Sequence, residues 1–164
     1  MKITSLIIAL IFYSSCYTQT VQLHYAGKNA TIISAVNEAN FILSNEAFYH
    51  SIDSINSFDN TTLNGRQISA EMKQSRVVEV TEYYKKHTRT NAKTQTKLKL
   101  NTAKLNRSLA SITSTLIHET IHAVDWAVNG EWDYTHRTQY VENPPISAPY
   151  VIGELAERFV RMVR

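Results

Sequence analysis

The segment from Leu109 to Asn129 constrains the fold most, because it has the pattern of one long amphipathic helix. Its apolar residues recur at steps of three and four, which is the spacing of a single buried helical face. They are Ile112, Leu116, Ile117, Ile121, Val124 and Val128. Ser108 is suited to cap the first turn, and Asn129-Gly130 is suited to end the helix. The sequence therefore predicts a helix of roughly 20 residues that gives one face to the core.

The second half of this helix carries His118, Glu119 and His122 in the pattern HExxH. Residues four apart in an α-helix lie about 40° apart around the axis and roughly 6 Å along it, so both imidazoles can reach one ion. Glu119 lies about 100° from His118 and about 60° from His122, where its carboxylate can reach a metal-bound water. The pattern predicts two metal ligands and a general base. The plainer alternative is a core helix with two histidines on its polar face.

These residue types suit hydrolysis at a zinc ion. Neutral imidazole is a good ligand for Zn²⁺, and a catalytic site keeps one position open for water or substrate. The ion lowers the pKa of bound water from about 15.7 toward about 7 and polarises the scissile carbonyl, while a nearby carboxylate completes the deprotonation. We therefore expect Zn²⁺ as the cofactor and a peptide or protein as the substrate.

The run HETIHAVD resembles the active-site helix of the zincin metallopeptidases. The resemblance covers this helix and the segment after it. It implies an α+β, zincin-like fold that is mainly helical, with a small sheet packed on the active-site helix. Metzincins continue as HExxHxxGxxH, but Asp125 stands where that pattern has Gly, and no His follows at the next ligand position. The chain is therefore not a metzincin by motif.

Three residues are candidates for the third metal ligand. His136 is favoured: it follows His122 by 14 positions, beyond Gly130, so that a returning loop can carry it to the ion. Asp133 is the first alternative, because GEWD is similar to the G-T-x-D segment of the aspzincins, although Glu replaces Thr. Glu154 is the second alternative, because zincins of the thermolysin type draw a Glu ligand from a later helix.

Three further residues are candidates for supporting roles. Asp125 lies three positions after His122 on the same side of the helix, where its carboxylate can accept the ring N–H of a metal-bound histidine. The alternative for Asp125 is an exposed helical position. Tyr134 and Tyr140 can donate a hydrogen bond to the oxyanion of the tetrahedral intermediate, or can serve in packing alone.

The N-terminus has the pattern of an export signal. Met1-Lys2 precedes an apolar run from Leu6 to Tyr13, and Ser14-Ser15-Cys16 follows as the small-residue end. We therefore expect residues 1–19 to be a signal peptide and the mature chain to be secreted, periplasmic or in the cell envelope, without a transmembrane segment. An alternative is a lipoprotein signal that ends before Cys16 and makes it a lipid anchor, although Tyr13 stands where Leu is usual. Because Cys16 is the only cysteine, neither a disulfide nor a thiolate zinc site is expected.

Residues 20–164 have the length of one domain, and we expect a monomer. Residues 32–55 predict one or two helices, and 69–74 a short helix after a loop at 60–65. Residues 97–101 alternate as a strand does, and 76–84 are the best candidate for its partner. The resemblance suggests residues 97–101 as the edge strand to which a substrate peptide binds. Ser147 and Pro149 predict the start of a last helix, whose apolar residues would pack on the active-site helix.

The chain is moderately basic, with a net charge of +3 and a pI of about 9.0. Its basic residues cluster between Lys85 and Arg107, but no nucleic-acid motif accompanies them, so we expect no nucleic-acid partner. A solvated face is the ordinary explanation of such a cluster, with attraction of acidic peptides or anionic envelope surfaces as a weaker one. The alternative to an enzyme is a non-catalytic envelope or secreted binding protein on a zincin-like fold.

Overall fold

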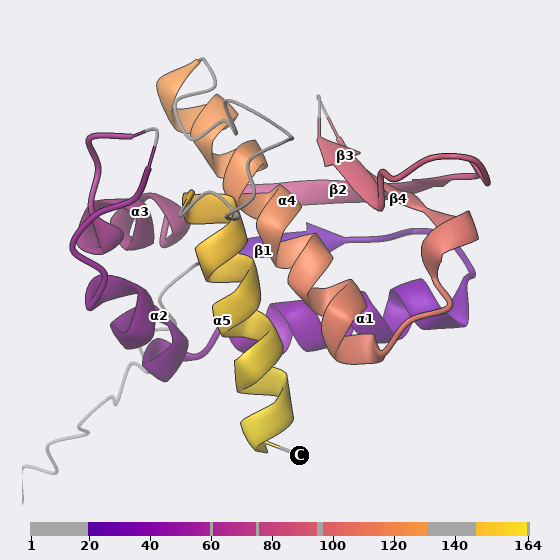
Figure 1. Cartoon of the computed structure of the whole chain (residues 1–164), viewed down its shortest axis with the longest axis horizontal. Coiled ribbons are helices and arrows are strands. Elements are labelled where there is room, and N and C mark those ends of the chain that lie inside the picture. The colour runs from indigo at the N-terminus through magenta and orange to yellow at the C-terminus, as the bar shows by residue number, and fades with distance from the viewer. Residues whose placement is uncertain (1–19, 60, 75, 95–96, 131–146, 164) are drawn as a thin grey trace, which may run out of the picture.

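The computed structural model describes residues 20–130 and 147–163, except residues 60, 75, 95 and 96 (Figure 1). The expected signal peptide, with Cys16, lies outside the described residues. So do the site candidates Asp133, Tyr134, His136 and Tyr140.

Within the described part, the fold is α+β and mainly helical, as predicted. The elements follow in the order β1 (Val21–His24), α1 (Ala30–Leu43), α2 (Glu46–Asp53), α3 (Gly65–Met72), β2 (Arg76–Tyr83), β3 (Ala92–Thr94), β4 (Leu98–Asn101), a 3-10 turn (Thr102–Lys104), α4 (Leu109–Asn129) and α5 (Ala148–Val163). Of these described helices, none is long and apolar enough to cross a membrane.

The strands form one sheet in the order β1-β2-β4-β3. β2 is parallel to both β1 and β4, whereas β3 is antiparallel to β4. The predicted pairing of residues 76–84 with 97–101 is confirmed, with Val80 opposite Leu98. The prediction that residues 97–101 form the edge strand is wrong, because β4 lies between β2 and β3. The edge of the described sheet on this side is β3, whose three residues are too few to show a recognisable alternation.

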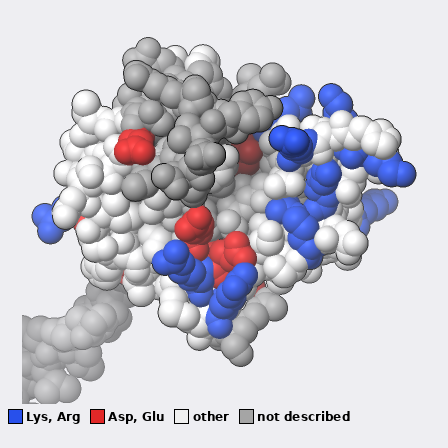
Figure 2. All heavy atoms as spheres, in the orientation of Figure 1, with Lys and Arg blue, Asp and Glu red and all other residues white. Residues whose placement is uncertain are grey.

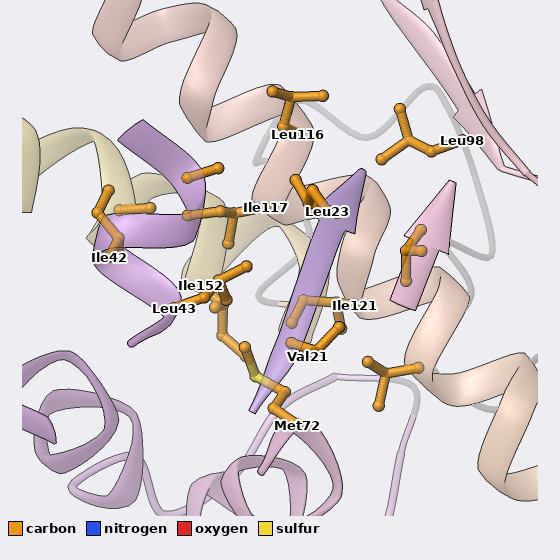
Figure 3. Close-up of a cluster of buried hydrophobic side chains, with 14 of the residues drawn as sticks. Val21, Leu23, Ile42, Leu43, Met72, Leu98, Leu116, Ile117, Ile121 and Ile152 are labelled. Atoms are coloured by element: carbon orange, nitrogen blue, oxygen red, sulfur yellow. The ribbon is translucent and has the colours of Figure 1, made fainter. Parts of the chain in front are cut away.

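The described helices cover one face of this sheet. Alternate strand residues are buried on that face, while the residues between them, such as Gln22, Val77 and Lys93, are exposed. α1 contacts β1, and α4 contacts β3, β4, α1 and α5, so that α4 lies in front of the sheet with α5 beside it (Figure 1). The core between the layers draws on residues from both the strands and the helices (Figure 3), and its central residues include Val21, Leu23, Ile42, Leu98, Leu116, Ile117, Ile121 and Ile152.

Helix α4 has the predicted bounds because both of its ends are capped. The Ser108 side chain accepts a hydrogen bond from the Ser111 N–H, and Gly130 adopts a left-handed conformation with φ 71°, from which its N–H donates to the Trp126 carbonyl. The predicted apolar face is fully buried at Ile112, Leu116, Ile117, Ile121 and Val124. Val128, near the end of the helix, is exposed, so the buried face ends one turn earlier than predicted.

Helices α3 and α5 differ in detail from the prediction. α3 begins at Gly65 instead of Ser69, because Asn64 and Gln67 form a capping box that starts the helix inside the expected loop. α5 begins as predicted. Its buried stripe recurs every fourth residue from Ala148 to Val160, however, which leaves Tyr150 partly exposed and Met162 exposed.

Candidate active site

His118 and His122 lie on one side of α4 with their rings close together. Their ring centroids are 5.3 Å apart at an interplanar angle of 70°, and both residues are half-buried. Two imidazoles that share one zinc ion at about 2.1 Å, with a tetrahedral angle between them, place their centroids roughly 5 Å apart. The two rings therefore fit a shared zinc ion, as the HExxH pattern predicts.

The Glu119 carboxylate is held by the edge strand. The Thr94 hydroxyl Oγ1, at the end of β3, donates to Glu119 Oε2 at 2.7 Å and lies 3.1 Å from the Glu119 carbonyl oxygen. Burial raises the pKa of the Glu119 carboxyl above its ordinary value, and the hydrogen bond from Thr94 opposes that rise. A carboxylate with a raised pKa and a fixed orientation is suited to take up a proton.

A pocket of about 420 Å³ opens beside these side chains. One wall is the end of the β2–β3 loop, including Arg89, and another is the start of α5, including Tyr150 and Glu154. His118 and Glu119 line it from α4. The pocket is thus bordered by the edge strand, the motif helix and the last helix, and it has room for a segment of a peptide.

Helix α5 approaches α4 closely at this pocket. A Cβ added at Gly153 would lie 3.2 Å from both His118 Cβ and the Ser114 carbonyl oxygen, so the glycine permits the contact. One turn earlier, the Tyr150 ring lies 4.7 Å from the His118 ring, edge to face. Tyr150 therefore restricts the orientation of the first imidazole.

The third metal ligand stays open. His136 and Asp133 lie outside the described residues. Glu154 lines the same pocket, but it is exposed and forms an ion pair with Arg158 at 3.4 Å. Within the part of the chain that is described, no three His, Cys, Asp or Glu side chains gather as a metal-binding group.

Asp125 is fully buried, so the alternative of an exposed helical position is wrong. Its Oδ1 accepts a hydrogen bond from Asn129 Nδ2 at 3.0 Å. A buried carboxylate needs such donors to offset its desolvation. A role in orienting an imidazole stays a prediction.

The β2–β3 loop owes its shape to Asn101, at the end of β4. The Asn101 side chain is fully buried; its Nδ2 donates to the carbonyls of Lys85 and Thr90, and its Oδ1 accepts from the Lys85 N–H. The Asn101 N–H donates to the Asn91 carbonyl at 2.8 Å. One buried residue therefore holds both ends of the loop that forms the pocket wall.

The motif identified three of the residues at this site, and sequence reasoning missed Thr94 and Arg89 as parts of it. Thr94 and Arg89 have no signal of their own in the sequence, because their positions depend on the pairing of β3 with β4. The sequence predicts that the apolar residues of the last helix, which include Tyr150, pack on α4, and the edge-to-face contact of Tyr150 with His118 agrees with that in part.

The comparisons with known proteins do not assign the chain to a family. No protein-family model matches it, and neither the curated proteins nor the solved structures contain a significant match. The function is therefore argued from the side chains at this site.

Proposed function

We propose that the chain is an exported zinc metallopeptidase with a zincin-like fold, in which the pocket beside α4 is the active site. The observation that carries the proposal is a pocket lined by His118 and by the buried, oriented carboxylate of Glu119, with the second imidazole, His122, adjacent to the first. His118, His122 and a third ligand, for which His136 stays favoured over Asp133 and Glu154, would hold the metal. A zinc ion bound there would act as a Lewis acid and would lower the pKa of a bound water.

Glu119 is the general base in this mechanism. Its carboxylate takes a proton from the attacking water and passes it to the nitrogen of the leaving amine as the peptide bond breaks. Thr94 keeps Oε2 in one orientation through its hydrogen bond of 2.7 Å. The Tyr150 ring packs nearly perpendicular to the His118 ring and limits the motion of that imidazole.

The substrate lies along β3. β3 is an edge strand of the described sheet, it contacts α4, and its last residue touches the base. A peptide that adds to this edge gains main-chain hydrogen bonds and passes directly beside Glu119. Such pairing gives affinity that depends little on the side chains of the peptide, so selectivity has to come from the pocket walls.

The test is metal-dependent proteolysis by the purified chain and its Glu119→Gln variant. We expect the wild type to bind zinc and to cleave casein, a chelator to abolish cleavage, and added zinc to restore it. Glu119→Gln removes only the base, so it should keep its zinc and lose about 10²- to 10⁴-fold in turnover. Metal analysis and initial rates measure the two effects.

Glu157→Gln is the matched control, because Glu157 lies on α5, forms an ion pair with Arg161 and does not line the pocket. It should cleave like the wild type. Near-normal turnover by a folded Glu119→Gln variant, or proteolysis that persists without metal, would refute the proposed mechanism.

A further inference from the structure

The charge of this chain is strongly segregated around the pocket. Residues 83–117 contain eight Lys or Arg and no Asp or Glu, although the whole chain has 17 basic and 14 acidic residues. In space, basic side chains gather at the end of the molecule that holds β3, β4 and the β2–β3 loop (Figure 2). The basic region therefore adjoins the proposed active site and is not spread evenly over the surface.

Arg89 brings this charge into the pocket itself. It lines the pocket together with His118 and Glu119. Its position is defined, because Asn101 donates to the carbonyl of Thr90 and to that of Asn91, the two residues that follow it. Among the described residues, no carboxylate forms an ion pair with Arg89. The carboxylates of the pocket have other partners, Thr94 for Glu119 and Arg158 for Glu154.

Lys93 extends the positive charge along the edge strand. It lies on β3 directly opposite Lys99 of β4, and like charges in this relation destabilise a sheet. The Lys93 ammonium lies 5.2 Å from the centroid of the Tyr83 ring, which offsets part of that repulsion. Lys93 lies on the face of the sheet away from α4 and does not line the pocket, so it adds to the positive charge of this edge, whereas Arg89 carries the charge inside the pocket.

We propose that this pocket selects peptides with Asp or Glu in the stretch that lies along β3 and the β2–β3 loop, and that Arg89 is the main determinant. The proposal rests on the proposed function for cleavage, but it concerns binding. A peptide fits the observations better than a nucleic acid or a membrane does, since Arg89 lines a pocket that also contains Glu119 and Glu154. Those carboxylates would repel an extended row of phosphates.

The experiment measures peptide binding to the zinc-loaded Glu119→Gln variant, which does not cleave, by fluorescence anisotropy. The probes are two peptides of equal length that carry glutamates or glutamines at the same positions. We expect the acidic peptide to bind about 10-fold more tightly at low salt, and this advantage to shrink as salt is added. Combining Arg89→Gln with Glu119→Gln should weaken the affinity for the acidic peptide about 5- to 20-fold. It should leave the affinity for the neutral peptide within about twofold.

Arg66→Gln is the matched control, because Arg66 is an exposed residue of α3 that does not line the pocket, and its loss changes the net charge equally. It should leave both affinities unchanged. Equal affinities for the two peptides, or equal losses in Arg89→Gln and Arg66→Gln, would overturn the proposal. So would an oligonucleotide or anionic vesicles that bind better than the acidic peptide and depend on Arg89.

These outcomes are separable from a failure of the proposed function. If the protein cleaves neutral and acidic peptides equally well, the proposed peptidase mechanism stands and the proposed acidic selectivity is refuted. If the protein cleaves no peptide but binds the acidic peptide preferentially through Arg89, the proposed selectivity stands and the proposed mechanism is refuted.

Discussion

The two faces of α4 differ sharply in what they contact. Toward the core, Leu116, Ile117 and Ile121 are completely buried against the sheet and the neighbouring helices (Figure 3). Toward the pocket, Ser114, Thr115, His118 and Glu119 line the open space. The core face determines where the helix lies. The residues of the pocket face contribute little to that placement and can therefore serve the proposed reaction. Substitutions on the core face should therefore affect stability, and those around the pocket should affect activity.

The largest effect on stability should come from Leu116→Ala. Leu116 is fully buried, and its truncation removes apolar contacts and leaves a cavity, so the free energy of unfolding should fall by about 3 kcal/mol. Urea denaturation followed by circular dichroism measures this.

Ser114→Ala, on the pocket face of the same helix, is the control. It should change stability by less than about 0.5 kcal/mol, because alanine favours the helix and the site is partly exposed. Equal losses in the two variants would contradict the division of α4 into a structural and a chemical face.

Thr94→Val tests the pocket side. It is nearly isosteric but removes the donor that orients Glu119 Oε2, so the proposed hydrolysis should lose about 10-fold in kcat, equivalent to about 1.4 kcal/mol, with KM within about twofold. Steady-state kinetics on a fluorogenic peptide separates the two constants.

Thr94→Ser keeps the hydroxyl and should restore most of the kcat. If Thr94→Ser is as slow as Thr94→Val, or if KM rises while kcat is unchanged, then Thr94 contributes to strand packing or substrate pairing and does not position the base.

The smallest effect should be a gain in stability from Thr113→Val on α4. The Thr113 side chain is fully buried, and no described group is a hydrogen-bond partner of its Oγ1. Replacing this hydroxyl by a methyl group removes an unsatisfied polar atom at nearly constant volume, so unfolding should cost about 1 kcal/mol more.

Thr120→Val is the matched control, because the Thr120 hydroxyl is equally buried but donates to the Leu116 carbonyl at 2.7 Å. It should give no gain. A stabilisation of the same size in both variants would show that packing, and not the unsatisfied hydroxyl, determines the effect.

The sequence predicted local features well and long-range pairing only in part. Helix α4 was predictable to its ends because Ser108 and Gly130 act within one turn. The pairing of β2 with β4 was also predictable, because residues 97–101 alternate polar and apolar and residues 76–84 are rich in Val, Thr and Tyr. β1 and β3 were missed: β1 pairs with β2, which lies far along the chain, and β3 has only three residues.

The same distinction applies to the candidate site. His118, Glu119 and His122 share one helix, so their spacing alone brings them together. Thr94 and Arg89 reach that helix only because β3 folds back on β4, and no short sequence pattern records such a contact. The HExxH residues were therefore predictable, whereas the groups that orient and surround them required the fold.

The buried amide of Asn101 has a consequence for how this protein can diverge. Because that single residue anchors the β2–β3 loop at Lys85 and Thr90, the positions between these two anchors can exchange their side chains without moving the points where the loop leaves the sheet. New preferences for ligands could thus arise by mutation in this short loop, while the helix that carries the histidines keeps its sequence unchanged.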